Sequence, residues 1–146
     1  MRGVLEALRA DIALGNAGAY EAIVHADVFS DLISQAEHLV DDGGYRRAGA
    51  VLVGATLEGH LRSLAPACGV AVSNAKGEHK KASQLNQDLY SANAYDKATC
   101  AQIDAWLKLR NDAAHPTEPS FETTHTDSEV RLMSMGVRDF IRRHPA

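Results

Sequence analysis

The chain of 146 residues lacks the features that mark several large classes of protein. Its two cysteines, Cys68 and Cys100, lie far apart and form no CxxC pair, so we expect reduced thiols and no disulfide. There is no run of about eighteen apolar residues, and the amino terminus lacks the apolar core and cleavage site of a signal peptide. These absences predict a cytoplasmic protein that has no membrane partner.

An excess of positive charge is also missing. Lysine and arginine number 15 against 19 aspartates and glutamates, which gives a net charge of -4 and an isoelectric point of about 5.9. Such a chain has no global field that attracts nucleic acid or anionic lipid. Contact with a phosphate backbone therefore has to be local, at the basic pairs Arg46-Arg47, Lys80-Lys81 or Arg142-Arg143.

Several catalytic motifs are absent as well. The sequence contains no GxGxxG after a strand, no Walker loop, no HExxH and no GxSxG. Its seven histidines do not have the spacing of metal ligands, so we expect no metal and no cofactor. Taken singly, each histidine is expected to be exposed to solvent or satisfied by a hydrogen bond.

What the sequence does contain is helical periodicity. Hydrophobic residues make up 45% and charged residues 23%, as in soluble globular proteins, and no alternating strand pattern is visible. The length suits one domain. We therefore predict an all-α protein, an antiparallel bundle of about four to five helices in a single domain over residues 1–146, with residues 1–18 as a lead-in helix.

The expected helices can be placed from apolar spacing and from residues that end helices. A long helix is expected from Tyr20 to about Val40, with Gly43-Gly44 supplying the left-handed conformation that follows it. Thr126 to Glu129 has the capping-box pattern and predicts the start of the last helix. The apolar face of the long helix is predicted to consist of Val24, Val28, Leu32, Ala36 and Leu39 or Val40. Further helices are expected over 45–64, 82–90 and from near 95 to 115, and loops over 67–80 and 116–124.

The segment that ends at Pro116 combines an apolar stripe with a misplaced charge. Ile103, Trp106 and Leu107 recur at helical spacing, and Arg110 continues the same pattern. Charged residues are seldom buried unless they are paired. Arg110 is therefore a candidate for a functional site or an interface.

The six residues Arg110-Asn111-Asp112-Ala113-Ala114-His115 resemble the R-x4-6-H signature of HEPN domains, with the polar residue that this family tends to place after the arginine. The likeness covers most of the chain from about Asp31 onward. It includes an alanine-rich helix, a lead-in to the signature and a capped final helix: Ala48–Val53 running into Leu57–Arg62, Trp106-Leu107, and the end at Phe140-Ile141.

This resemblance implies a small helical bundle that commonly dimerises so that two signatures face each other, and many such proteins are metal-independent ribonucleases. Arg110 and His115 would be the functional pair, Asn111 the polar support, and Glu58 an acidic partner that orients them. The implied partners are RNA, a second copy of the chain and an antitoxin protein. Members regulated by a nucleotidyltransferase carry a tyrosine two residues after the histidine, where this chain has Thr117, so a tyrosine-modifying antitoxin is not expected.

The residue types suit this chemistry on physical grounds. Cleavage of RNA by its own 2′-hydroxyl requires a base, an acid and positive charge on the phosphorane. Histidine titrates in the useful range, and arginine can bind two phosphate oxygens at once. One chain's signature supplies one histidine and one arginine, so two chains in a symmetric dimer would supply both acid and base. We assign proton transfer to His115, phosphate binding to Arg110 and a supporting hydrogen bond to Asn111.

Structural roles explain the same residues in other ways. Arg110 near a helix C-terminus gains about 0.3–1 kcal/mol from the helix dipole, and His115 could cap the last carbonyls. The chain could therefore be a noncatalytic HEPN-like module that binds a nucleotide or a protein, or a generic dimerisation bundle. Trp106 is expected to be core or interface packing, and the small surface at Gly54-Ala55 is expected to serve packing within the bundle.

Overall fold

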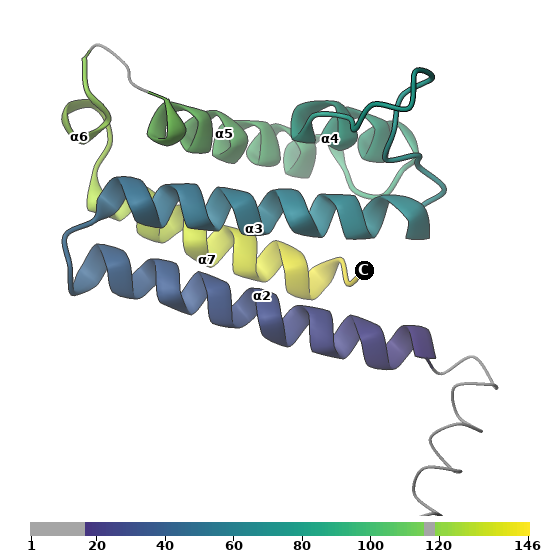
Figure 1. The fold of residues 1–146 in the computed structure, drawn as a ribbon, viewed down its shortest axis with the longest axis horizontal. Helices are drawn as coiled ribbons and strands as arrows, with labels where there is room; N and C mark the ends of the chain where they lie inside the picture. The colour runs from purple at the N-terminus through teal and green to yellow at the C-terminus, as the bar shows by residue number, and fades with distance from the viewer. Residues whose placement is uncertain (1–16, 116–118) are drawn as a thin grey trace, which may run out of the picture.

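The computed structural model describes residues 17–115 and 119–146, and side chains from residue 24 onward. This part of the chain is all-helical, as predicted, and forms a helical bundle (Figure 1). It contains one helix more than expected, because a single turn forms in the segment predicted to be the second loop. The predicted lead-in helix lies almost wholly in residues 1–16, outside the described residues. The helices are α2 (Ala17–Asp41), α3 (Arg46–Ala67), α4 (Ala82–Ser91), α5 (Lys97–Ala114), α6 (Phe121–Thr124) and α7 (Asp127–Arg143).

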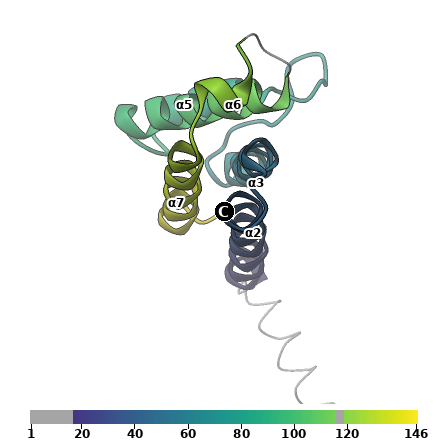
Figure 2. The ribbon, with the colours of Figure 1, turned by 90° about the vertical axis from the view of Figure 1, so that its left-hand side faces the viewer.

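Helix α3 is at the centre of the bundle, because it packs against α2, α4, α5 and α7. Helix α2 runs antiparallel to both α3 and α7, and α5 runs back over α3 in the opposite direction (Figure 1). Figure 2 shows α2, α3 and α7 nearly end-on, with α5 lying across them. The helices form two layers, one of α2, α3 and α7 and one of α4 and α5. Helix α3 packs against the other helices of its own layer and against both helices of the second layer.

The core is formed by the inward stripes of these helices. On α7, every predicted core position is buried, namely Val130, Met133, Val137, Phe140 and Ile141. The predicted capping box at its start is confirmed: Thr126 N donates to Glu129 Oε2 over 2.7 Å, and Glu129 N donates to Thr126 Oγ1 over 3.2 Å. Burying these apolar side chains at about 25 cal/mol per Å² supplies the main favourable term for the fold.

The predicted apolar face of α2 is wrong in its first half. Val24 and Val28 are 44% and 50% exposed, whereas Ile33, which was not placed on that face, is fully buried. The stripe that meets α3 and α7 runs through Ile33, Ala36 and Val40. Several apolar stripes coexist on this helix, and spacing alone does not say which of them the neighbouring helices cover.

Glycines and helix ends fall largely where the sequence places them. Gly44 has φ +67°, the left-handed conformation predicted for the turn between α2 and α3. Helix α3 passes through Pro66 and ends at Ala67, slightly later than predicted, before Gly69 at φ +73°. Trp106 packs against the core as expected, and its ring lies so close to Gly136 on α7 that a Cβ there would overlap it.

The two cysteines are free thiols; Cys100 is buried and Cys68 is half-buried. None of the described helices is long and apolar enough to cross a membrane.

Candidate functional site

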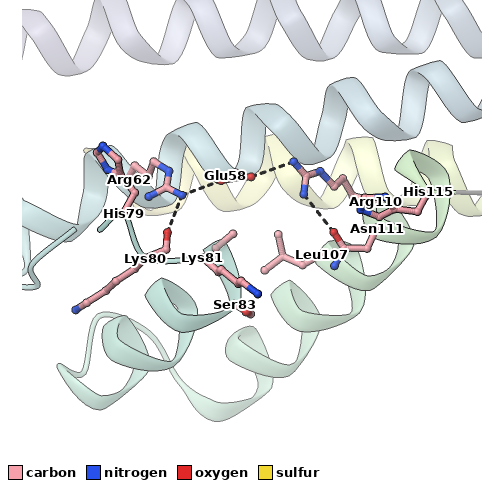
Figure 3. A pocket seen from close by; sticks show the side chains of 11 residues that line it. Glu58, Arg62, His79, Lys80, Lys81, Ser83, Leu107, Arg110, Asn111 and His115 are labelled. Atoms are coloured by element: carbon pink, nitrogen blue, oxygen red, sulfur yellow. Dashed lines mark hydrogen bonds and ion pairs between the residues drawn. The ribbon is translucent and has the colours of Figure 1, made fainter. Parts of the chain in front are cut away.

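A cleft of about 480 Å³ lies between α3, α5 and the start of α4 (Figure 3). Helix α5 contributes the end of the stretch singled out in the sequence, including Arg110, Asn111 and His115. Helix α3 contributes Glu58 and Arg62. The structure therefore brings all four predicted site residues to one cleft, although Glu58 is 52 positions from Arg110. The lining is completed by the end of the chain segment before α4, the first residues of α4 and one residue of α5, namely His79, Lys80, Lys81, Ala82, Ser83 and Leu107.

Glu58 is held between two arginines. Its Oε2 accepts a hydrogen bond from Arg110 Nη2 over 3.1 Å, and its Oε1 accepts one from Arg62 Nη2 over 2.9 Å. The three side chains are 23–30% exposed, so they are partly shielded from water. The charge on Arg110 is thus paired, as its position on the apolar stripe required. Figure 3 shows the carboxylate in the middle, with one guanidinium on each side.

Gly54 explains how Arg110 reaches Glu58. A Cβ at Gly54 would overlap Cβ and Cγ of Arg110, so the arginine stem rests directly on the backbone of α3. Glu58 follows one turn later on the same helix, which brings its carboxylate next to the guanidinium. The glycine at this position thus serves packing within the bundle, as predicted, and it also sets the position of a site residue.

Asn111 and His115 line the cleft at the C-terminal end of α5. Asn111 Oδ1 accepts a hydrogen bond from Arg110 Nη1 over 3.2 Å. His115 is the C-cap residue of α5, and its backbone N–H donates to the carbonyl of Asn111 over 3.1 Å. Its side chain is exposed and lines the cleft. An exposed imidazole that lines a cleft is accessible to a bound molecule.

The opposite wall is the connection between α3 and α4, which the sequence predicted only as a loop. Lys80 N donates to Val72 O over 2.9 Å, and Ser73 forms an isolated bridge with His79. Arg62 Nη2 also donates to the carbonyl of Lys80 over 2.7 Å, so the arginine ties this wall to α3. His79 and Lys81 are thereby held at the cleft.

The two lysines of this wall differ in their surroundings. Lys80 Nζ is 2.8 Å from Asp88 Oδ2, and this hydrogen bond lowers the pKa of the Asp88 carboxyl. Lys81 is exposed at the start of α4. Among the lining residues, Glu58 alone is acidic, whereas Arg62, Arg110, Lys80 and Lys81 are basic, and the charge of Lys80 is paired with Asp88. The cleft is thus locally positive on an acidic protein, as any contact with a phosphate backbone would require.

Two donors of the cleft's arginines are unsatisfied. Arg62 Nη1 and Arg110 Nε are buried atoms that have no hydrogen-bond partner among residues 24–115 and 119–146. A buried donor without a partner costs about 1–3 kcal/mol, and strain, an ordered water or a bound ion accounts for such groups in proteins.

The remaining basic pairs have structural contacts. Arg46 donates to Asp127 Oδ1 and to the carbonyls of Glu122 and His125, so it joins the start of α3 to the α6–α7 connection. Arg143 pairs with Asp139 over 3.0 Å. Of the three pairs noted in the sequence, Lys80-Lys81 is the one that lines the cleft.

Sequence reasoning did not place Arg62 or His79 at this cleft, and it noted Lys81 only as part of a basic pair. In the sequence Arg62 follows Glu58 by four positions, the spacing of a surface pair on a helix, and this spacing gives no sign of a site. Its second contact, with the Lys80 carbonyl, depends on the path of the following chain, which no local pattern reveals. The basic pair Lys80-Lys81 was the available signal for this wall.

The chain was compared with protein-family models, with curated proteins and with solved structures. No match was found. The resemblance to HEPN domains therefore rests on the residues themselves, and any functional conclusion has to be argued from the cleft.

Proposed function

We propose that this protein is a metal-independent endoribonuclease of the HEPN type, with a role as a toxin or in defence. In this proposal RNA is cleaved in a composite site at a homodimer interface. The observation that supports it best is the convergence of Arg110, Asn111, His115 and Glu58 on one locally positive cleft. An arginine, a titratable imidazole and a polar support are the groups that cleavage by a 2′-hydroxyl needs.

The proposed reaction is an intramolecular transesterification of the RNA backbone. The 2′-oxygen forms a bond to the neighbouring phosphorus, and the bond from that phosphorus to the 5′-oxygen breaks. One imidazole takes the 2′-hydroxyl proton, and a second, protonated imidazole gives a proton to the leaving 5′-oxygen. Arg110 binds the phosphate oxygens and offsets their growing negative charge. Asn111 holds the guanidinium through its hydrogen bond.

The second imidazole is proposed to come from a second copy of the chain. His115 is exposed at the cleft, so it is accessible to a partner related by a twofold axis. The dimer would place two Arg110–His115 ends across a shared groove, one histidine acting as base and the other as acid. RNA would be the substrate, and an antitoxin protein would be expected to cover the same groove.

The test is incubation of the purified protein with transfer RNA and messenger RNA in EDTA. We expect cleavage by the wild type and a loss of about 100-fold or more in His115→Ala and Arg110→Ala, because each removes a proton-transfer or charge-stabilising group. Arg138→Ala is the matched control, since Arg138 is similarly shielded and paired with Glu37 over 2.8 Å at the α2–α7 contact. Cleavage that is unchanged in both cleft variants would refute the proposal.

A second candidate is supported by the Glu58–Arg110 ion pair itself. If that pair only stabilises the bundle, the protein is a noncatalytic HEPN-like module that binds a nucleotide or a partner protein. This alternative expects Arg110→Ala to lower the melting temperature while RNA remains intact at any protein concentration.

A further inference from the structure

The cleft contains a second guanidinium whose surroundings mirror those of Arg110. Arg62 and Arg110 each donate one Nη2 hydrogen to a different oxygen of Glu58, over 2.9 Å and 3.1 Å. A histidine lies beyond each arginine, His79 on one side and His115 on the other (Figure 3). The cleft therefore holds two guanidiniums around one carboxylate, with an imidazole beyond each of them.

Each of these arginines also has one donor that the described residues leave unpaired. Arg62 Nη1 and Arg110 Nε are buried and have no hydrogen-bond partner within the described part of the chain. A planar guanidinium can bind two phosphate oxygens through a pair of N–H donors. Two guanidiniums on either side of Glu58, each on a side chain that is 29–30% exposed, fit two separate anionic groups better than one.

Additional positive charge is present at the Arg62 end. Lys81, the N-cap residue of α4, is exposed on the cleft, and the neighbouring Lys80 charge is taken up by Asp88. The charge offered to an anion at this end thus comes from Arg62 and Lys81. Neighbouring phosphates along a single strand are the anions that the two guanidiniums would bind.

We propose that Arg62, together with Lys81, binds a second phosphate of the RNA strand, adjacent to the phosphate held at Arg110. This inference rests on the proposed ribonuclease function and names how its substrate is positioned. Through its two hydrogen bonds, Glu58 fixes the positions of both guanidiniums before the strand binds. Arg62 is then a positioning residue, and a substrate with a single phosphate would fill only the Arg110 subsite.

The test uses an eight-nucleotide 2′-O-methyl RNA, which lacks the attacking hydroxyl, and measures its binding by fluorescence anisotropy over a series of salt concentrations. For single strands, each lost phosphate contact reduces the slope of log K against log salt by about 0.7. We expect that reduction in Arg62→Gln and in Arg110→Gln. Arg138→Gln, the matched control at the Glu37 pair, should keep the slope of the wild type.

A dinucleotide with one phosphate and 2′-O-methyl sugars separates the two subsites. Arg110→Gln should weaken its binding, whereas Arg62→Gln should leave it within about twofold of the wild type. An Arg62→Gln slope equal to that of the wild type would overturn the proposal. So would a loss of dinucleotide binding in Arg62→Gln as large as that in Arg110→Gln.

Two further measurements keep the test decisive. If Arg62→Gln fails to fold, Lys81→Gln replaces it, because Lys81 is exposed and should show the same smaller slope.

Cleavage of unmodified RNA is scored separately. Intact RNA with the expected slopes would refute the ribonuclease function and leave the second phosphate subsite standing. Cleaved RNA with an unchanged Arg62→Gln slope would refute the subsite alone, and absence of binding by the wild type would overturn both.

Discussion

Acidification should destabilise this protein through one buried histidine. His60 is fully buried, its Nε2 donates to the backbone carbonyl of His144 over 2.7 Å, and Nδ1 lies 3.4 Å from Nε2 of His25. Rings of Phe29 and Phe140 also contact it. Burial lowers the pKa of His60 from its ordinary value of 6.5 to about 4, because the charged form would lose its water.

The sign and size of the effect follow from linkage. Between pH 6.5 and pH 4 the unfolded chain binds a proton at this histidine that the folded protein does not bind, so stability falls as the pH is lowered. At about 1.4 kcal/mol per pKa unit, the free energy of unfolding should fall by about 3 kcal/mol across this pH window because of His60. Burial lowers the pKa of His25 and of His144 as well, so both act in the same direction. Exposed His38, whose pKa is raised by its hydrogen bond to Asp42, acts in the opposite direction.

The assay is urea unfolding, followed by circular dichroism, at intervals from pH 8 to pH 4. The wild type should lose stability mainly below pH 6.5. His60→Gln keeps a donor for the His144 carbonyl but does not titrate. Between pH 6.5 and pH 4 its free energy of unfolding should therefore fall by about 3 kcal/mol less than that of the wild type. Equal pH dependence in the two proteins would refute the reasoning.

Three further predictions concern the cleft and the fold. Gly54→Ala should lower the rate of RNA cleavage, because the added methyl group displaces Arg110 from Glu58. The free energy of unfolding should fall only modestly, because the overpacking cost of about 1–3 kcal/mol is offset in part by the helix preference of alanine, about 1 kcal/mol. His79→Ala should leave cleavage near the wild-type rate, because the second imidazole in the proposed dimer is His115 of the other copy. Thr126→Ala removes a side-chain cap and should lower the free energy of unfolding by about 1 kcal/mol, measured by urea unfolding, with cleavage unchanged.

Each of these has a control or a contrary outcome. Gly136→Ala forces a similar overlap with Trp106, so it should cost comparable stability without the loss of cleavage. If Gly136→Ala and Gly54→Ala reduce cleavage equally, the special role of Gly54 is refuted. A large loss of cleavage in His79→Ala would place both imidazoles in one chain. Unaltered stability in Thr126→Ala would contradict the contribution of the capping box.

The sequence was most informative where local chemistry decides the structure. The capping box at Thr126 and the buried stripe of α7 were both predicted, because a cap and a single apolar face depend on neighbouring residues only. The partner of Arg110 came from the family resemblance, and the structure contains the Glu58 contact. Arg110 can contact Glu58 only because Gly54 leaves room for the arginine stem, whereas the sequence predicted only a packing role for this glycine.

The missed features depend on tertiary arrangement. Helix α2 presents Ile33 to α3 and α7 and leaves Val24 and Val28 exposed, because the neighbouring helices cover only one of its apolar stripes. Helix α6 lies in a segment predicted as loop, and its Phe121 is fully buried. The role of Arg62 in the cleft required the path of residues 69–81, which turns back to place the Lys80 carbonyl beside its guanidinium.

The most direct test of the central claim is the chemistry of the ends that the protein produces from a 5′-labelled RNA in EDTA. Attack by the 2′-hydroxyl predicts a 2′,3′-cyclic phosphate on the upstream fragment, no cleavage at a nucleotide that carries a 2′-O-methyl group, and no such product from His115→Ala. Intact RNA with the wild type, or the same cleavage by wild type and His115→Ala, would contradict the account.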